Sequence, residues 1–186
     1  MRCFVAIELD LGAREALASL VRNAPRSRDV RWCSPEQLHV TLKFLGDVDD
    51  ALLPGVCDAV VNAAARVEPF TVALGEIGAF PNARSPRVLW CGLSDPSGGC
   101  AAWLRAADPA MEALGFEPER RALHPHITLA RSRAGPGNAF LARMLAELPF
   151  PPARETSVEA VVLFQSTLDP RGVRYTPMLR APLGGT

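Results

Sequence analysis

The chain has 186 residues, no formal net charge, and 48% apolar residues, which suits one soluble globular protein rather than a general polyanion binder. Among the basic residues arginine dominates, so a nucleic-acid ligand would be held by a local cluster of arginines. No segment has the length of a membrane span, the N-terminal apolar run is too short for a signal peptide, and no pair of the five cysteines has C-x-x-C spacing. We therefore expect a cytoplasmic protein with no membrane contact and no structural disulfides.

Taken in chain order, the first half predicts alternating strands and helices. A buried strand at residues 2–9 is followed by a helix that Asp10 caps and Pro25 ends. The pattern then predicts strands at 30–33, 38–44 and 70–75, with a helix from about residue 50 to residue 66 between the last two, and a loop at 78–86.

The second half continues with a strand at 87–93, a helix at 100–114, a charged loop at 117–125, a strand at 126–130, a loop at 131–138 and a helix at 139–148. It closes with strands at 157–167 and 173–179 around a turn at 169–172. Runs of consecutive strands replace strict β-α-β alternation, which favours an α+β fold with largely antiparallel sheets.

One tetrapeptide motif occurs twice. His39-Val40-Thr41-Leu42 returns 87 positions later as His126-Ile127-Thr128-Leu129. Each copy alternates polar and apolar residues, so in a strand the histidine and the threonine share one face. A pair of imidazoles facing one cleft can act as general base and general acid. The threonine hydroxyls can donate hydrogen bonds to a phosphate between them, and in-line displacement at phosphorus then needs no metal.

Three other interpretations compete with this one. A histidine on a strand is more often structural than catalytic. A metal site is a second alternative, because His124, His126 and His39 are all imidazoles, yet no cysteine or carboxylate cluster stands at ligand spacing. A non-catalytic module that binds RNA ends is the third, but such a module is typically basic and rich in aromatics, and this chain has 6% aromatic residues.

The motifs and their surroundings resemble the 2H phosphoesterase superfamily, and most closely its bacterial RNA 2′,3′-cyclic phosphodiesterase branch, long called 2′–5′ RNA ligases. The resemblance lies in LHVTLKFLG at 38–46 and PHITLAR at 125–131. It extends to RCFVAI at 2–7, GAFP at 78–81, PRVLW at 86–90, LFQS at 163–166 and Tyr175, and so to nearly the whole chain. Gln165 stands where glutamate is common in the family.

This resemblance implies an α+β, bilobal fold in which residues 1–186 form one compact domain, with one motif from each lobe beside a central cleft and helices on the outside. It implies hydrolysis of an RNA or nucleoside 2′,3′-cyclic phosphate to a 2′-phosphomonoester without metal or cofactor, and reverse 2′–5′ ligation. His39 would donate a proton to the departing 3′ oxygen, His126 would accept one from water, and Thr41 and Thr128 would hold the phosphate. Sequence alone does not decide which histidine is the acid. We expect a monomer.

Further substrate contacts are expected near the motifs. Arg131 is a phosphate ligand if its strand twists or ends there; in a regular strand it would share the face of Ile127 and Leu129, away from the cleft. Lys43 has the parity of His39 and Thr41, which places it at the cleft rim or on the solvated surface. Phe80 is expected to stack on a base or to pack, and Tyr175 to pack in the core or to contact the substrate. Phe44 is expected to enter the core, and His124 to be a loop residue.

Overall fold

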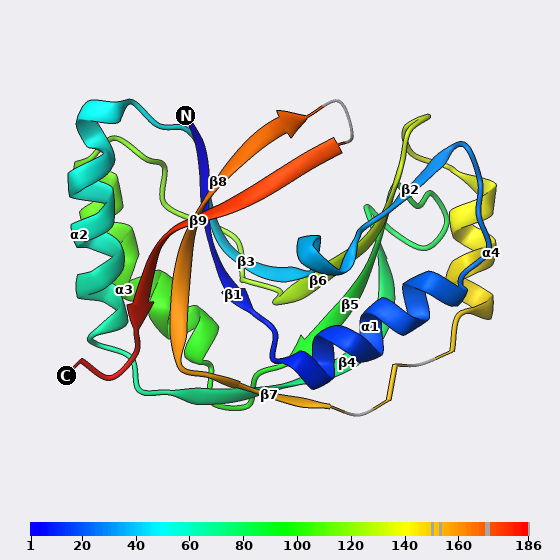
Figure 1. The fold of residues 1–186 in the computed structure, drawn as a ribbon, viewed down its shortest axis with the longest axis horizontal. Coiled ribbons are helices and arrows are strands. Elements are labelled where there is room, and N and C mark those ends of the chain that lie inside the picture. Colours follow the sequence, from blue (N-terminus) through cyan, green and yellow to red (C-terminus); the bar gives the residue numbers. More distant parts are fainter. Residues whose placement is uncertain (150, 153, 170–171, 186) are drawn as a thin grey trace.

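Both motifs lie on neighbouring strands in the middle of one antiparallel sheet (Figure 1). The structure is a computed structural model that describes residues 1–149, 151–152, 154–169 and 172–185. Within these residues the sheet contains β1 (Arg2–Glu8), β2 (Val30–Trp32), β3 (His39–Asp47), β4 (Phe70–Phe80), β5 (Val88–Ser94), β6 (His126–Ser132), β7 (Glu155–Val158), β8 (Ala160–Asp169) and β9 (Gly172–Pro182). The helices are α1 (Leu11–Asn23), α2 (Leu53–Ala64), α3 (Gly99–Ala113) and α4 (Ala139–Glu147), with short 3₁₀ turns at Pro35–Gln37 and Asp50–Leu52.

The order of the strands divides the sheet into two halves. It runs β7-β4-β5-β6-β3-β1-β8-β9, while β2 pairs with β6 beside this path. We call β3, β1, β8 and β9 the first half-sheet and β7, β4, β5 and β6 the second half-sheet, because β3 carries the first motif and β6 the second. The halves meet through a single residue pair, Val40 opposite Ile127. Every strand pairing among the described residues is antiparallel, which confirms the predicted α+β class.

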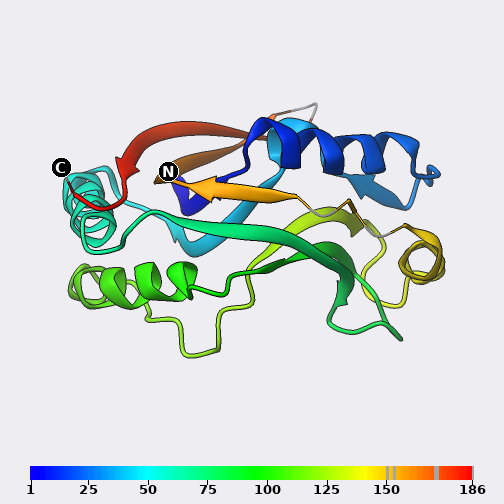
Figure 2. The same ribbon diagram turned by 90° about the horizontal axis from the view of Figure 1, so that it is seen from below.

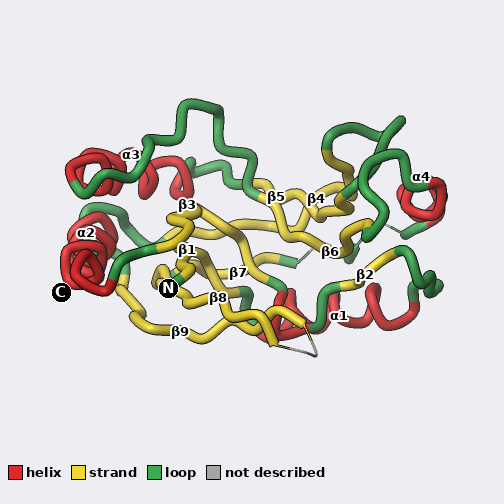
Figure 3. The backbone as a smooth tube through the Cα atoms, turned by 90° about the horizontal axis from the view of Figure 1, so that it is seen from above, coloured by secondary structure: helices red, strands yellow, loops and turns green. Residues whose placement is uncertain are grey.

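The helices lie outside the curled sheet (Figures 1 and 2). α2 and α3 lie side by side at one end of the molecule, and α4 lies at the other end, with α1 reaching toward it. In Figure 3, β4, β5 and β6 lie on one side of the molecule and β1, β8 and β9 on the other. None of the helices in the described ranges combines the length and hydropathy that a membrane crossing requires.

Local sequence explains the first elements. Asp10 caps α1 by accepting a 2.7 Å hydrogen bond from the backbone N–H of Ala13, as predicted. Residues 3–7 of β1 are buried because both faces of the strand are covered. Its odd-numbered residues enter the main core with the helices, while its even-numbered residues join a small cluster on the cleft face that consists of Phe4, Ala6, Val162 and Phe164. The cleft therefore has an apolar, aromatic floor beside β3.

Two predicted strands differ clearly from the structure, and one predicted turn lies partly outside the residues that it describes. β4 continues to Phe80, through residues expected in a loop, and Gly78 makes this pairing possible because a Cβ there would lie 2.2 Å from the Trp90 ring. The strand expected at 157–167 is divided at Glu159, since β7 pairs with β4 whereas β8 pairs with β1 and β9. The expected turn at 169–172 includes residues 170 and 171, which lie outside the described residues.

Candidate active site

All four residues of the two His-x-Thr pairs line one cleft of about 690 Å³. Val40 and Ile127 are fully buried beneath it, and alternation along each strand turns His39, Thr41, His126 and Thr128 to the opposite face. Arg131 and Tyr175 line the same cleft. A concavity of about 780 Å³ lies between α1 and α4, but it contains none of these residues.

The backbone orients both imidazoles in the same way. Nδ1 of His39 lies 2.8 Å from the carbonyl oxygen of Gln37, and Nδ1 of His126 lies 2.7 Å from the carbonyl oxygen of His124. A carbonyl oxygen only accepts, so Nδ1 of each ring carries the proton and donates it. In the neutral rings, Nε2 therefore carries a lone pair and is the nitrogen that can accept a proton.

The threonines differ in their contacts. Oγ1 of Thr41 lies 3.1 Å from Nε2 of His39, and because that nitrogen carries no proton in the neutral ring, the hydroxyl donates to it. Oγ1 of Thr128 accepts from Nη2 of Arg131 at 3.4 Å. Each hydroxyl can rotate, so both are able to donate to an anion that enters the cleft.

Aromatic rings support both imidazoles. Tyr175 meets His39 edge to face with ring centres 5.0 Å apart, and Phe4 lies 4.8 Å from the same ring. Phe80 meets His126 edge to face at 5.0 Å. These contacts hold the rings in place and keep water from much of their surface.

Burial makes both histidines weaker bases than usual. The pKa of His39 is lowered to about 4, mainly by burial; the hydrogen bond to the Gln37 carbonyl opposes this shift, and the positive charge of Arg131 adds to it. The pKa of His126 is also lowered, first by burial and then by Arg131 and His124. Both rings are therefore neutral in the free protein at pH 7, and His39 is the more deeply buried.

Each motif strand contains a bulge immediately after its threonine. In β3, Thr41 pairs with Ala6 and Lys43 with Val5, so Leu42 is the extra residue. In β6, Thr128 pairs with Trp90 and Ala130 with Leu89, so Leu129 is the extra residue. A bulge reverses the alternation of side chains beyond it.

The bulges decide the location of three predicted residues. Arg131 is turned onto the cleft face by the bulge, and β6 does not end there but continues to Ser132. Lys43 is turned inward, so both locations expected for it, the cleft rim and the solvated surface, are wrong. Phe44 was expected in the core, and this is also wrong: it is 67% exposed and lines the cleft.

The remaining candidates lie near the site. Tyr175 lines the cleft and contacts His39, whereas Phe80 contacts His126 from outside that cleft, in a neighbouring concavity. His124 is an exposed loop residue, as expected, but its carbonyl oxygen orients His126. No cluster of three or more His, Cys, Asp or Glu side chains suited to a metal occurs in the described part of the chain.

Several residues that line the cleft were not predicted from the sequence, and Phe4 and Cys33 are two of them. Phe4 contacts His39 from β1, a strand that reads as uniformly buried, so its role has no local signal. Cys33 also lines the cleft. Burial raises the pKa of its thiol to about 11, and it therefore stays protonated and unreactive at neutral pH.

Comparison with known proteins links these features to one family. The family model described as "LigT like Phosphoesterase" matches residues 7–90 and 93–175, and each of the two segments contains one motif. An RNA 2′,3′-cyclic phosphodiesterase from Methanothermobacter thermautotrophicus is 34% identical over 180 residues, or 96% of each chain. Another from Archaeoglobus fulgidus is 31% identical, over 94% of this chain and 96% of its own.

Solved structures agree with this relationship. The crystal structure of E. coli LigT complexed with 3′-AMP has a TM-score of 0.80 and 26% identity, over 98% of this chain and 97% of that one. E. coli LigT complexed with NADP⁺ has a TM-score of 0.77 and 27% identity. Taken with the paired motifs on neighbouring strands of one sheet, these matches establish that the chain belongs to the LigT-like phosphoesterase family, one of the 2H phosphoesterases.

Proposed function

We propose that this protein hydrolyses the 2′,3′-cyclic phosphate of RNA or of a nucleotide to a 2′-phosphomonoester. The observation that carries the proposal is the pair of imidazoles, each with Nδ1 bound to the backbone and Nε2 left for proton transfer, beside a single cleft. The names of the relatives and the nucleotide bound to E. coli LigT support the substrate class.

The proposed step transfers two protons in opposite directions. His126 Nε2 accepts a proton from water while the water oxygen bonds to phosphorus, and the bond from phosphorus to the 3′ oxygen breaks. His39 Nε2–H donates its proton to the departing 3′ oxygen. Thr41, Thr128 and Arg131 contact the non-bridging oxygens and stabilise the negative charge that grows on them.

The proposed acid must be protonated when substrate is bound. In the free protein His39 is neutral at pH 7, because its pKa is about 4. A phosphate anion beside the ring favours the imidazolium, and it also offsets the charge of Arg131, which otherwise opposes protonation. The assignment of His39 as donor and His126 as acceptor therefore requires that substrate binding brings a proton to His39.

The same step with another nucleophile gives the second proposed reaction, 2′–5′ ligation. A 5′ hydroxyl takes the place of water, His126 accepts its proton, and its oxygen bonds to phosphorus. The bond from phosphorus to the 3′ oxygen breaks, His39 protonates that oxygen, and a 2′–5′ linkage remains. Water is in large excess, so hydrolysis is expected to dominate.

We further propose that the protein acts as a monomer and that residues 1–186 form one two-lobed domain. Both motif strands come from one chain, which supports this proposal.

The deciding experiment combines substrate, chelator and product analysis. The protein is incubated with a nucleoside 2′,3′-cyclic phosphate in excess EDTA, and the product isomer is identified by chromatography. We expect the 2′-phosphomonoester at an undiminished rate, since protons and arginine supply the charge stabilisation. Formation of the 3′ isomer, or dependence on added metal, would contradict the mechanism. Binding of RNA ends without turnover would identify a non-catalytic module instead.

A further inference from the structure

Lys43 is the only lysine in the chain, whose other nineteen Lys or Arg residues are arginines. Among the described residues, Lys43 is the one charged residue that is buried, and its side chain is only 4% exposed. Burial of an ammonium is costly unless charge and hydrogen bonds compensate it. The proposed reaction gives this lysine no part, so its burial requires another explanation.

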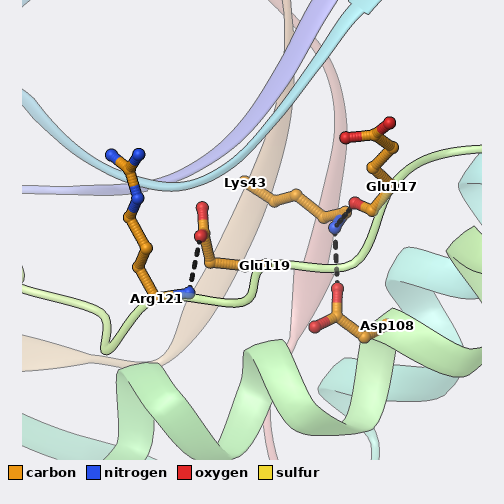
Figure 4. A network of polar contacts seen from close by, with 5 residues as sticks. All are labelled: Lys43, Asp108, Glu117, Glu119 and Arg121. Carbon is orange, nitrogen blue, oxygen red and sulfur yellow. Dashed lines mark hydrogen bonds and ion pairs between the residues drawn. The ribbon is translucent and has the colours of Figure 1, made fainter.

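Two groups from distant parts of the chain compensate the ammonium (Figure 4). Nζ donates to Oδ1 of Asp108 on α3 at 2.7 Å and to the carbonyl oxygen of Glu117 at 2.9 Å. Asp108 is 19% exposed, so this pair is shielded from solvent. A compact ammonium can donate in both directions from one atom, whereas the wider guanidinium that the chain uses elsewhere would need more room.

The segment that Lys43 binds leads into the second motif. After β5 the chain leaves the second half-sheet, forms α3 against α2, and returns through residues 114–125 to His126 on β6. The backbone N–H of Leu93 donates to the carbonyl of Pro125 at 3.0 Å, which fixes the far end of the return. Lys43 fixes its near end, and His124, whose carbonyl orients His126, lies between them.

Backbone pairing joins the two half-sheets near the site in two places. β2, which leads into β3 through the turn at Pro35–Gln37, pairs with β6 from Val30–Ser132 to Trp32–Ala130, beside the direct contact of the motif strands. The two motif strands, β3 and β6, pair directly at only one position, Val40 opposite Ile127. Lys43 adds a buried polar connection between β3, which carries His39, and the segment that delivers His126. A shift of about 1 Å in a catalytic group can cost on the order of 100-fold in rate.

We propose that Lys43 is a positioning residue. Through Asp108 and the Glu117 carbonyl it holds residues 117–125, and thereby the position and orientation of His126 relative to His39. The effect of Lys43 on kcat can be measured only if the proposed function is correct. Its effect on the orientation of His126 can be measured without turnover.

The test compares variants that break different parts of the contact. Lys43→Met removes both hydrogen bonds, and we expect kcat to fall at least tenfold with less change in KM, together with a lower Tm. Asp108→Asn keeps an acceptor and leaves the Glu117 bond intact, so kcat should fall less than threefold. The double variant Lys43→Met/Asp108→Leu removes the uncompensated carboxylate, so Tm should recover while kcat stays low. It also provides the test if Lys43→Met alone does not fold.

A second readout reports on His126 directly. In ¹⁵N-labelled protein, the Nδ1–H signal of His126 should weaken or shift in the double variant, while that of His39 should change less. Recovery of kcat together with Tm, or an unchanged His126 signal, would overturn the proposal and leave Lys43 a purely structural role. Absence of turnover in the wild-type protein would instead refute the proposed function, and the NMR comparison would still decide the positioning role.

Discussion

Phe44 and Arg131 hold equivalent positions in the two motif strands. Each lies five residues after the histidine of its motif, and each is turned onto the cleft face by the bulge at the preceding leucine. One strand thus presents an exposed ring to the cleft and the other a guanidinium. A flat apolar surface and a cation match the two parts of a nucleotide, its base and its phosphate.

Arg131→Ala should weaken substrate binding. The guanidinium lies beside Thr128 and faces the cleft, so its loss removes a charged hydrogen bond to phosphate and should raise KM roughly 10-fold or more. Steady-state kinetics with a nucleoside 2′,3′-cyclic phosphate measures the effect. Arg133→Ala is the matched control, because Arg133 is exposed two residues further along and does not line the cleft. Equal losses in both variants would exclude a specific contact.

Phe44→Ala tests the bulge in β3. An exposed ring contributes little to the core, so the free energy of unfolding should change by about 0.5 kcal/mol or less. Leu42→Ala, two positions earlier, removes a buried side chain and should cost about 2–5 kcal/mol. Loss of base stacking should raise KM of Phe44→Ala about 5-fold or more. A large loss of stability in Phe44→Ala would place the ring in the core and contradict the structure.

Replacement of either imidazole should stop most turnover. His39→Ala and His126→Ala should each lower kcat by about 100-fold or more, the usual scale for a lost general acid or base. Thr41→Ala and Thr128→Ala should cost less, because Arg131 and the other threonine still contact the phosphate. Circular dichroism checks that each variant is folded. A threonine variant more damaged than both histidine variants would argue for a different mechanism.

The pH dependence should be bell-shaped with an acidic optimum. kcat/KM reports on the free enzyme, in which burial holds the pKa of both histidines below 6.5. One ring must be protonated and the other neutral, so kcat/KM should decline at alkaline pH from an optimum below 6.5. Bound phosphate raises both pKa values, which moves the optimum of kcat to higher pH. A kcat/KM optimum above pH 8 cannot be reconciled with two buried imidazoles.

Stability should also fall in acid because of His39. Its pKa is about 6.5 in the unfolded chain and about 4 in the folded protein, so between these values the unfolded state binds more protons. The free energy of unfolding should therefore decrease by about 3 kcal/mol as the pH falls from 6.5 to 4. Urea unfolding at several pH values measures this change. His39→Gln should flatten the slope, whereas His124→Gln, which alters an exposed side chain, should leave it in place.

Sequence reasoning predicted the facing of the motif side chains correctly up to each threonine and failed beyond it. The alternation His-x-Thr-x placed four polar side chains on one face correctly, because those residues lie before the bulges. Beyond the threonines the same rule failed for Lys43 and Phe44, since one extra residue in a strand exchanges its two faces. A bulge is defined by pairing with the neighbouring strand, and no local pattern in residues 39–47 reports how they pair with β1.

The main chain, rather than any side chain, supplies the acceptor that orients each imidazole. Residues 37 and 124 are glutamine and histidine, yet the carbonyl oxygen of each accepts a hydrogen bond from Nδ1 of a motif histidine. Natural variation can therefore alter both positions without losing the tautomer that the chemistry needs. This also accounts for the brevity of the internal repeat, in which only the side chains that line the cleft, and the apolar residues beneath them, have reason to stay alike in the two copies.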